Sequence, residues 1–313
     1  PDDLPFLWDI LDRVKAPDAG ELTEPAKAMV RESEDATQRW LELRAAPPDL
    51  ELRSKLPGLI TEPYGDQLQC IAFHVARQRS LEGSEAGCGK TISVLGTYAY
   101  WKALDPKTRG LILCINSGKL DWEEQVKTHT NFSVRIVGNG TKDVQEQLKS
   151  YTKKPSDLLI LHYDCLRTES ILKAVKALDF QFLAYDEAHL LKNPDTKRHK
   201  AAFALTEHFP KAKFVAATGT AMDGNPKSAW GLLQMVHGSK KQTYFPDYRS
   251  WQRYFLTMEQ RYFGKRKVWV ETGIKNLHRL KACLEPASIR FLKVDVMGRP
   301  SKIYQTRLVT MTG

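Results

Sequence analysis

The chain has 313 residues, and its 42% hydrophobic and 10% aromatic content describes a globular protein with a full core and excludes an intrinsically disordered chain. No run approaches the ~18 consecutive apolar residues of a transmembrane helix. The acidic start PDDLPFLWDILDR has no signal-peptide pattern. The five cysteines are scattered without a C-x-x-C pair, so neither a zinc site nor a disulfide framework is indicated.

The net charge of +10 is unevenly distributed along the chain. Residues 1–60 contain 13 acidic and 8 basic side chains, a net charge of −5, so the rest of the chain carries +15. A basic body of this kind favours a polyanionic partner, most simply nucleic acid, although generic solubility charge produces the same count.

Residues 1–58 are predicted to form a helical accessory region. Apolar side chains recur at helical spacing between Phe6 and Val14, and a second helix is expected from about residue 25 to 43. Pro47 and Pro48 then interrupt the pattern. No chemistry is evident in this region, but it is a possible contact surface for a protein partner.

From residue 61 onward, short apolar runs alternate with amphipathic helical stretches. The runs predict buried strands at 110–115, 134–137, 157–162, 180–186 and 213–218. Helices are expected near 90–104, 120–130, 142–151, 165–178 and 197–208. This alternation favours an α/β fold, a mainly parallel sheet with helices on both faces. Ligands of such sheets bind beyond the carboxyl ends of the strands.

The stretch SEAGCGKT at residues 84–91 fits the end of the phosphate-binding loop pattern G-x-x-x-x-G-K-[ST]. The glycines allow backbone N–H groups to surround a triphosphate, Lys90 would contact the β- and γ-phosphates, and the Thr91 hydroxyl would bind Mg²⁺. Ser84 stands where the first glycine is expected, and we interpret it as tolerated because serine is small. A glycine-rich turn before an ordinary helix is the alternative. The predicted nucleotide-binding residues of the loop are Ser84, Glu85, Ala86, Gly87, Cys88, Gly89, Lys90 and Thr91.

The sequence YDEAH at residues 185–189 closes the apolar run FQFLAYD. Asp186 is placed to hold Mg²⁺ directly or through water, and Glu187 to act as the general base that deprotonates the attacking water. His189 is one residue too remote for the metal, so we expect it to couple this site to a neighbouring motif. The catalytic candidates are therefore Glu187, Lys90 and Asp186. Alone, such a cluster also fits a helix cap with solvated charges.

At this point the chain resembles the first RecA-like lobe of superfamily-two helicase-like ATPases, and within them the Swi/Snf-type DNA translocases. The resemblance rests on SEAGCGKT, on YDEAHLLKNPDTKRHKA at 185–201, and on TGTAMDGNPKSAWGLLQMV at 218–236. It runs from about Tyr64 to the end. Lys192-Asn193-Pro194 and Thr218-Gly219-Thr220 are markers of this group, whereas RNA helicases usually have Ser-Ala-Thr at the latter position.

The resemblance assigns expected roles to weaker motifs. Gln67 corresponds to a glutamine that reads the adenine edge, although an exposed polar residue at a helix start is the alternative. Thr218 and Thr220 would link the nucleotide state to the grip on DNA, while Asp223 and Asn225 also fit a simple turn. The strand-end motifs that approach DNA supply the candidates Ser117, Lys119, His162 and Arg167. Trp122 lies in one of these motifs and is interpreted as a packing residue.

Residues 240–269 combine eight Lys or Arg and nine aromatic residues with only two acids. Basic and aromatic side chains together can bind nucleic acid. Tyr248, Trp251, Tyr254 and Phe255 sit at helical spacing, which favours a packed face. The better DNA candidates are Lys265, Arg266 and Lys267. In the resembled family this region is a helical protrusion, which we expect at about 237–275.

The implied domain organisation is an ATP-binding lobe over residues 59–295, followed by the start of a linker over 296–313. The segment that leaves the first lobe in this family is matched here by Arg290, Lys293, Asp295 and Val296. The second RecA-like lobe and its arginine fingers are not in this sequence, so we expect these 313 residues to bind ATP but to hydrolyse it very poorly.

The resemblance implies the ATP-binding lobe of an ATP-dependent double-stranded DNA translocase, with ATP and Mg²⁺ as cofactors and duplex DNA as partner. Two alternatives stay open: a single-lobe, nucleotide-responsive adaptor for DNA or protein, and an RNA-directed helicase lobe. We expect no membrane association. A cytoplasmic location is expected because the short lobe favours a prokaryotic or viral origin, and a nuclear one if the protein is eukaryotic.

Overall fold

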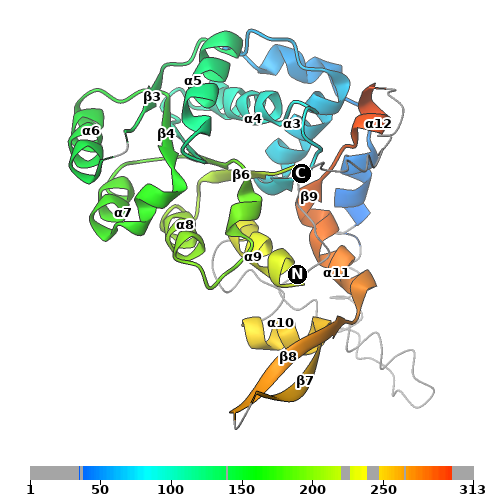
Figure 1. Cartoon of the computed structure of the whole chain (residues 1–313). Coiled ribbons are helices and arrows are strands. Elements are labelled where there is room, and N and C mark those ends of the chain that lie inside the picture. Colours follow the sequence, from blue (N-terminus) through cyan, green and yellow to red (C-terminus); the bar gives the residue numbers. More distant parts are fainter. Residues whose placement is uncertain are drawn as a thin grey trace, which may run out of the picture.

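The computed structural model describes residues 35, 38–138, 140–219, 226–237, 247–263 and 266–297, apart from the side chains of Phe263, Arg266 and Met297. Among these residues, seven parallel strands form one sheet in the order β3-β4-β2-β5-β6-β1-β9 (Figure 1). The strands are β1 Arg79–Glu82, β2 Gly110–Cys114, β3 Val134–Ile136, β4 Leu158–His162, β5 Phe182–Tyr185, β6 Lys213–Ala217 and β9 Ser288–Ile289.

The expected strands correspond to β2 through β6, and the expected parallel α/β architecture is confirmed. The sequence did not reveal β1 and β9. The first is four residues long and carries Arg79 and Glu82, and the second has two residues, so neither forms a recognisable apolar run.

Helices cover both faces of the sheet, as Figure 1 shows. One face carries α3 Gly65–Arg77, α4 Lys90–Leu104 and α5 Gly118–His129. The other carries α6 Thr141–Lys153, α7 Glu169–Lys176, α8 Lys197–His208, α9 Pro226–His237 and α11 Leu277–Leu284. Short turns complete the lobe: η1 Leu50–Lys55, η2 Tyr163–Arg167, η3 Ala188–Leu191, η5 Glu285–Ala287 and α12 Lys293–Met297.

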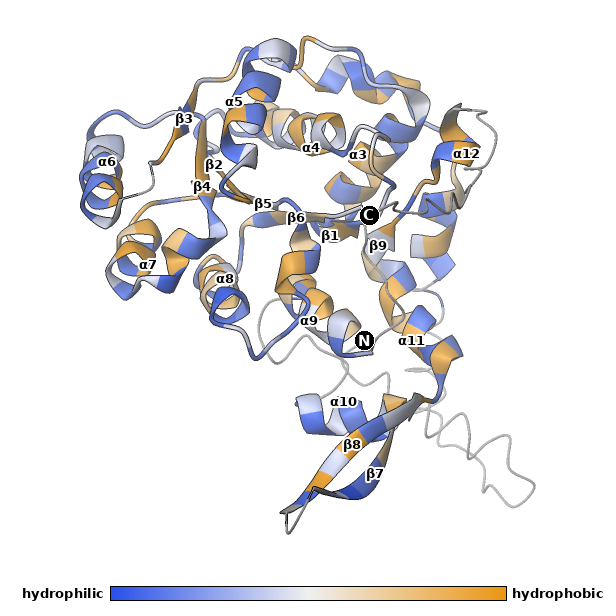
Figure 2. Ribbon diagram, in the orientation of Figure 1, coloured by the Kyte–Doolittle hydropathy of each residue, from blue (hydrophilic) through white to orange (hydrophobic). Residues whose placement is uncertain are grey.

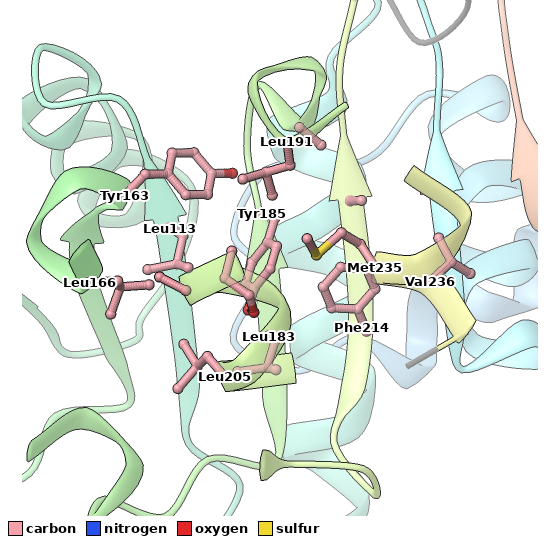
Figure 3. Packing of buried hydrophobic residues seen from close by; sticks show 14 of the residues in the cluster. Leu113, Tyr163, Leu166, Leu183, Tyr185, Leu191, Leu205, Phe214, Met235 and Val236 are labelled. Carbon is pink, nitrogen blue, oxygen red and sulfur yellow. The ribbon is translucent and has the colours of Figure 1, made fainter. Parts of the chain in front are cut away.

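The larger core cluster fills the space between the sheet and α6 to α9 (Figure 3). Tyr185, the last residue of β5, packs edge-on against Phe214 of β6 with 4.8 Å between ring centroids. Its hydroxyl donates to the Ala202 carbonyl at 3.1 Å and lies 2.9 Å from the Thr206 hydroxyl on α8. A buried aromatic residue of this kind contributes about 3–5 kcal/mol to stability. The core therefore holds β5 firmly up to the residue that precedes Asp186.

The opposite face is covered most closely by α4. Its residues 92–99 are buried without interruption, although the hydropathy colouring in Figure 2 shows that the helix mixes hydrophobic with weakly polar residues. A Cβ on Gly96 would lie 2.4 Å from Ile71 of α3, so glycine is needed where these two helices meet. This packing orients the helix whose first turn carries Lys90 and Thr91.

The segment after α9 differs from the expected helical protrusion. Among the described residues between 238 and 275, only α10, Tyr248–Phe255, is helical, and β7 Leu256–Phe263 and β8 Arg266–Ile274 form an antiparallel hairpin that projects from the lobe (Figure 1). The expectation fails because the helical spacing of aromatics holds only within α10. Trp251 and Phe255 are buried as expected, whereas Tyr262 and Trp269 on the hairpin are 70% and 60% exposed.

The N-terminal region is described only from residue 35. Residues 38–45 are helical, and the first expected helix, near Phe6 to Val14, lies outside the described residues. Leu52 and Leu56 pack with Leu68 and Ile71 of α3, so packing against the lobe begins before residue 58. Within the described part of the chain, no helix is long and apolar enough to cross a membrane.

Candidate nucleotide-binding site

The phosphate-binding loop connects β1 to α4 at the carboxyl edge of the sheet. Gly89 caps α4 in the left-handed region, with φ of 77°, and Gly87 has φ of 89°. A Cβ at Gly89 would also lie 2.0 Å from the Gln67 side-chain nitrogen. Both glycines are therefore required by the backbone, and Gly89 is required a second time by the approach of Gln67.

Ser84 replaces the first glycine of the pattern without backbone strain. Its φ is not positive, so a side chain is tolerated at this position. The serine is 1% exposed, and its hydroxyl accepts a hydrogen bond from the Phe291 N–H at 3.2 Å. The departure from the pattern thus places a hydrogen-bond acceptor in the wall of the loop.

The Lys90 side chain contacts the backbone of its own loop. Its ammonium donates to the carbonyls of Ser84, at 2.9 Å, and of Glu85, at 3.1 Å. Ala86 and Gly87 are exposed at the outer turn of the loop, and Thr91 is half-buried in the first turn of α4. The turn of the loop is therefore exposed to solvent, and two backbone carbonyls hold the Lys90 ammonium in place.

Asp186 follows β5 directly and is held by three groups. Its N–H donates to the Leu113 carbonyl at 2.8 Å, its carbonyl accepts from the Tyr163 hydroxyl at 2.6 Å, and its Oδ2 accepts from the Trp122 indole N–H at 2.8 Å. Burial raises the pKa of the Asp186 carboxyl above its ordinary value, and the Trp122 hydrogen bond and the nearby Lys90 oppose that rise. A desolvated carboxylate of this kind is suited to a cation.

Glu187 adopts a left-handed backbone conformation, with φ of 47° and ψ of 46°, which is strained for a residue with a Cβ. Its Oε2 lies 3.0 Å from Nδ1 of His189, and the same nitrogen lies 3.2 Å from Oγ1 of Thr218. A proton on Nδ1 can therefore be shared between the Glu187 carboxylate and Thr218. The structure brings together the two motifs that His189 was expected to connect.

The Thr-Gly-Thr motif reaches the phosphate-binding loop through its glycine. A Cβ at Gly219 would lie 3.5 Å from the Ala86 backbone nitrogen and 3.7 Å from the Lys90 ammonium. Thr218 is fully buried, and its N–H donates to the Glu82 carbonyl at 2.9 Å. Thr220 lies outside the described residues, as do Asp223 and Asn225.

Gln67 is buried, with 6% exposure, at the start of α3. Its Oε1 accepts from the Tyr64 N–H at 3.0 Å, and its amide nitrogen faces Gly89. A cavity of about 690 Å³ opens at the start of the same helix, lined by Tyr64, Asp66 and Phe291 among others but not by Gln67. In this structure Gln67 supports the loop, and reading an adenine edge requires its amide to exchange the Tyr64 contact for the base.

The DNA candidates occupy different environments. Ser117 is exposed before α5, and Arg167 is half-exposed, 3.6 Å from Asp164. Lys119 is buried, with its ammonium 3.0 Å from the Val137 carbonyl, so it does not present its charge to a ligand here. His162 is half-buried, its Nε2 lies 2.8 Å from the Cys165 thiol, and burial lowers its pKa.

Lys267 is exposed on β8 of the hairpin. Lys265 and the side chain of Arg266 lie outside the described part of the structure. The described DNA candidates therefore do not form one cluster: Lys267 lies on the projecting hairpin, and the others follow β2 and β4.

Three contacts of this site were missed by sequence reasoning. Trp122 was interpreted as a packing residue and is indeed buried, but its N–H also binds Asp186. Tyr163 supports the same residue from η2, and Lys293 reaches the loop at Gly87. A buried tryptophan needs a partner for its N–H, which was the one available signal.

These features define the class of the protein. A phosphate-binding loop between β1 and α4, an acidic pair after β5 and a parallel sheet covered on both faces make it a P-loop nucleotide-binding lobe.

The chain belongs to the SNF2-related domain family, whose model matches residues 67–313. It is 25% identical over 239 residues to the DNA annealing helicase and endonuclease ZRANB3 of Bos taurus, covering 75% of this chain and 21% of that protein. It is 26% identical over 279 residues to Helicase SWR1 of Saccharomyces cerevisiae, covering 84% and 18%. The chain thus spans about a fifth of the length of these relatives.

The fold is similar to that of the Sulfolobus solfataricus SWI2/SNF2 ATPase core solved in complex with dsDNA. The TM-score is 0.59 at 18% sequence identity, over 76% of this chain and 46% of that chain. The expected family and the RecA-like fold are therefore confirmed.

Proposed function

We propose that these residues form the ATP-binding lobe of an ATP-dependent double-stranded DNA translocase or helicase-like remodeller. The observation that carries the proposal is the meeting of three motifs at one edge of the sheet. Lys90 lies within electrostatic reach of the partly buried Asp186, and Gly219 lies against both the loop and Lys90. Membership of the SNF2-related family supports an ATP hydrolase activity.

The residues present fit ATP with Mg²⁺. Thr91 offers a hydroxyl and Asp186 a desolvated carboxylate, and hard oxygen donors of this kind bind Mg²⁺ when phosphates and waters supply the remaining ligands. A bound Mg²⁺ neutralises charge on the β- and γ-phosphates. Lys90 would leave the carbonyls of Ser84 and Glu85 and turn its ammonium to the same phosphates.

Glu187 is the residue proposed to activate water. Its carboxylate would accept a proton as the water oxygen forms a bond to the γ-phosphorus and the bond to the β,γ-bridging oxygen breaks. His189 holds one carboxylate oxygen of Glu187 at 3.0 Å, which fixes its direction. Because His189 also contacts Thr218, the orientation of the base would depend on the segment after β6.

We propose that DNA binding affects ATP hydrolysis through this dependence of Glu187 on the segment after β6. The segment after β6 resembles the family motif that links nucleotide state to DNA, and the Sulfolobus solfataricus SWI2/SNF2 ATPase core of similar fold was solved in complex with dsDNA. Ser117, His162, Arg167 and Lys267 remain candidates for DNA contacts. The partly buried His162 and the buried Lys119 would need to move first.

The proposal is tested first by nucleotide binding to the 313-residue chain. We expect it to bind a fluorescent ATP analogue with Mg²⁺ and Lys90→Ala to abolish that binding. Hydrolysis should be very slow, because an arginine finger from a second lobe is worth about 10³–10⁵ in rate. Robust DNA-stimulated turnover by this chain alone would contradict the division of the site between two lobes.

Competition experiments separate the remaining readings. When these residues are joined to a second lobe, duplex DNA should stimulate ATP hydrolysis more than duplex RNA at the same salt concentration. Stimulation by RNA alone would favour an RNA-directed lobe. Nucleotide-dependent DNA binding without any turnover in that longer protein would favour an adaptor. The contact of residues 1–58 with a protein partner and the cytoplasmic location stay predictions.

A further inference from the structure

The chain that leaves the lobe runs along the phosphate-binding loop. We call residues 288–293 the exit segment. Its first two residues form β9 and pair with β1, Leu81 opposite Ser288 and Glu82 opposite Ile289. The pairing continues beyond both strands, because Gly83 N–H donates to the Ile289 carbonyl at 2.8 Å. The loop therefore starts as an extension of the sheet that the exit segment borders.

Further contacts extend this pairing across the first half of the loop. Phe291 N–H donates to the Ser84 hydroxyl at 3.2 Å, and Glu85 N–H donates to the Phe291 carbonyl at 2.9 Å. Lys293 N–H then donates to the Glu85 carboxylate at 2.8 Å, which starts α12. Ser84 and Cys88 are buried beneath the segment. The exit segment is thus part of the wall of the loop.

The Lys293 side chain extends this wall to the turn that presents Gly87. A Cβ on Gly87 would lie 2.9 Å from Cε and 3.1 Å from Nζ of Lys293. Because Gly87 has no side chain and a positive φ, the ammonium can lie against the backbone at that turn. No ion pair among the described residues involves the Lys293 ammonium.

Two lysines therefore lie close to the loop. Lys90 contacts the carbonyls of Ser84 and Glu85, and Lys293 of the exit segment occupies the space that a side chain on Gly87 would fill. Burial raises the pKa of the Cys88 thiol between them, and both ammonium groups are close enough to oppose that rise. A second positive charge beside a phosphate-binding turn is placed for a phosphate oxygen.

We infer that Lys293 is a second phosphate-binding lysine of the nucleotide site, and that its contact with the phosphates of a bound nucleotide ties the exit segment to the nucleotide state. This inference rests on the proposed function. It adds a residue from the opposite end of the lobe to a site otherwise built from the loop and the strand ends. Because residues 294–297 continue in α12, phosphate binding by Lys293 would order the start of the path that leaves the lobe.

The test compares nucleotides that differ only in phosphate number. Fluorescent ATP, ADP and AMP analogues are titrated, with Mg²⁺, into the 313-residue chain and its variants. Lys293→Gln removes the charge but keeps a polar side chain, and Lys293→Arg keeps the charge. Arg290→Gln is the matched control, because Arg290 is exposed in the same segment and carries the same charge.

We expect Lys293→Gln to weaken ATP binding about tenfold, the equivalent of about 1.4 kcal/mol, and AMP binding less than about twofold. Lys293→Arg should stay within about threefold of the wild type, and Arg290→Gln within about twofold, since removal of an exposed charge has a small effect. ATP should also slow amide hydrogen exchange of the exit segment in the wild type, and much less in Lys293→Gln.

Two outcomes would overturn the inference: unchanged ATP affinity in Lys293→Gln, or an equal loss for ATP and AMP, which would indicate a structural role. If circular dichroism shows that Lys293→Gln does not fold, Lys293→Met provides the same neutral comparison. A wild-type chain that binds none of the three nucleotides would refute the proposed function itself. Normal wild-type binding with an unaffected variant would refute only the role of Lys293.

Discussion

The indole N–H of Trp122 on α5 donates a hydrogen bond to Oδ2 of Asp186 at the end of β5, with 2.8 Å between the two atoms. The bond joins a helix that follows one strand to the acidic group that follows its neighbour, because β2 and β5 are paired in the sheet. It both satisfies a buried donor and stabilises the charged form of the carboxyl.

Trp122→Phe should therefore lower the free energy of unfolding by about 1.5–3 kcal/mol, the usual value of a hydrogen bond to a charged group. It should also raise the pKa of Asp186 further and weaken Mg²⁺-dependent nucleotide binding. Urea unfolding at neutral pH measures the first effect. Trp101→Phe is the control, because the buried Trp101 N–H has no hydrogen-bond partner among the described residues. Equal losses in the two variants would contradict the role of Trp122.

Asp186→Asn should stabilise the nucleotide-free protein at neutral pH. Burial raises the pKa of Asp186 in the folded state. Its contribution to stability is thus complete below the ordinary pKa of 3.8 and is lost as the pH rises through the folded pKa. The asparagine variant does not lose this stability, because it has no carboxyl to ionise. The difference in free energy of unfolding between the variant and the wild type should therefore be largest at neutral pH and disappear in acid. Urea titrations across this range measure the difference. A variant that is less stable than the wild type at neutral pH would contradict the sign.

The same variant should lose Mg²⁺-dependent nucleotide binding, because a neutral amide is a poorer ligand for the cation than a carboxylate. Gain in stability with loss of function is expected where a site holds a desolvated charge. Titration of the ATP analogue with and without Mg²⁺ measures this second effect, and Mg²⁺-enhanced binding by the variant would remove Asp186 from the proposed metal site.

Glu187 offers a measurement of backbone strain. Glu187→Gly and Glu187→Ala both remove the carboxylate and its contact with His189, but only glycine relieves the positive φ. We expect the glycine variant to be more stable than the alanine variant by about 1 kcal/mol. Neither should support ATP hydrolysis in a two-lobed protein. Equal unfolding midpoints in urea would show that the conformation is not strained.

Gly89→Ala should destabilise the protein by more than about 1 kcal/mol, because alanine is disfavoured at φ of 77° and its Cβ would meet Gln67. Adding Gln67→Ala should recover the share of the lost stability that comes from the steric contact. The share that comes from the positive φ should remain. Gly273→Ala on β8 is the control, since a Cβ there would make only an ordinary 3.7 Å contact. Complete recovery in the double variant would contradict the requirement for glycine.

Lys267 and Lys119 should respond differently to loss of charge. Lys267→Gln removes an exposed charge and should weaken duplex DNA binding and reduce its salt slope by about 1, without changing stability. Lys119→Met removes a buried ammonium and its bond to Val137, so its main effect should be on stability. Lys149→Gln on α6 is the control for the exposed charge. A salt slope unaffected by Lys267→Gln would remove the hairpin from the DNA-binding surface.

The candidate site could be located from local patterns, because each motif is short and continuous. Residues 84–91 and 185–189 identify a phosphate-binding loop and an acidic strand end, and apolar runs located β2 to β6. Four strands, β1, β7, β8 and β9, were not predicted, because their patterns were weak, very short or misleading. The polar β1 forms no apolar run, and the helical spacing of aromatics in α10 concealed the hairpin that follows.

The sequence by itself determined the family and the parallel α/β class and singled out the candidate loop and acidic residues, since these depend on residue type and spacing along the chain. Only the tertiary structure decided which distant groups complete the site. Trp122 meets Asp186 and Lys293 meets Gly87 because the sheet places β2 beside β5 and β9 beside β1. Strand order is set by packing of the whole lobe, and no local pattern encodes it.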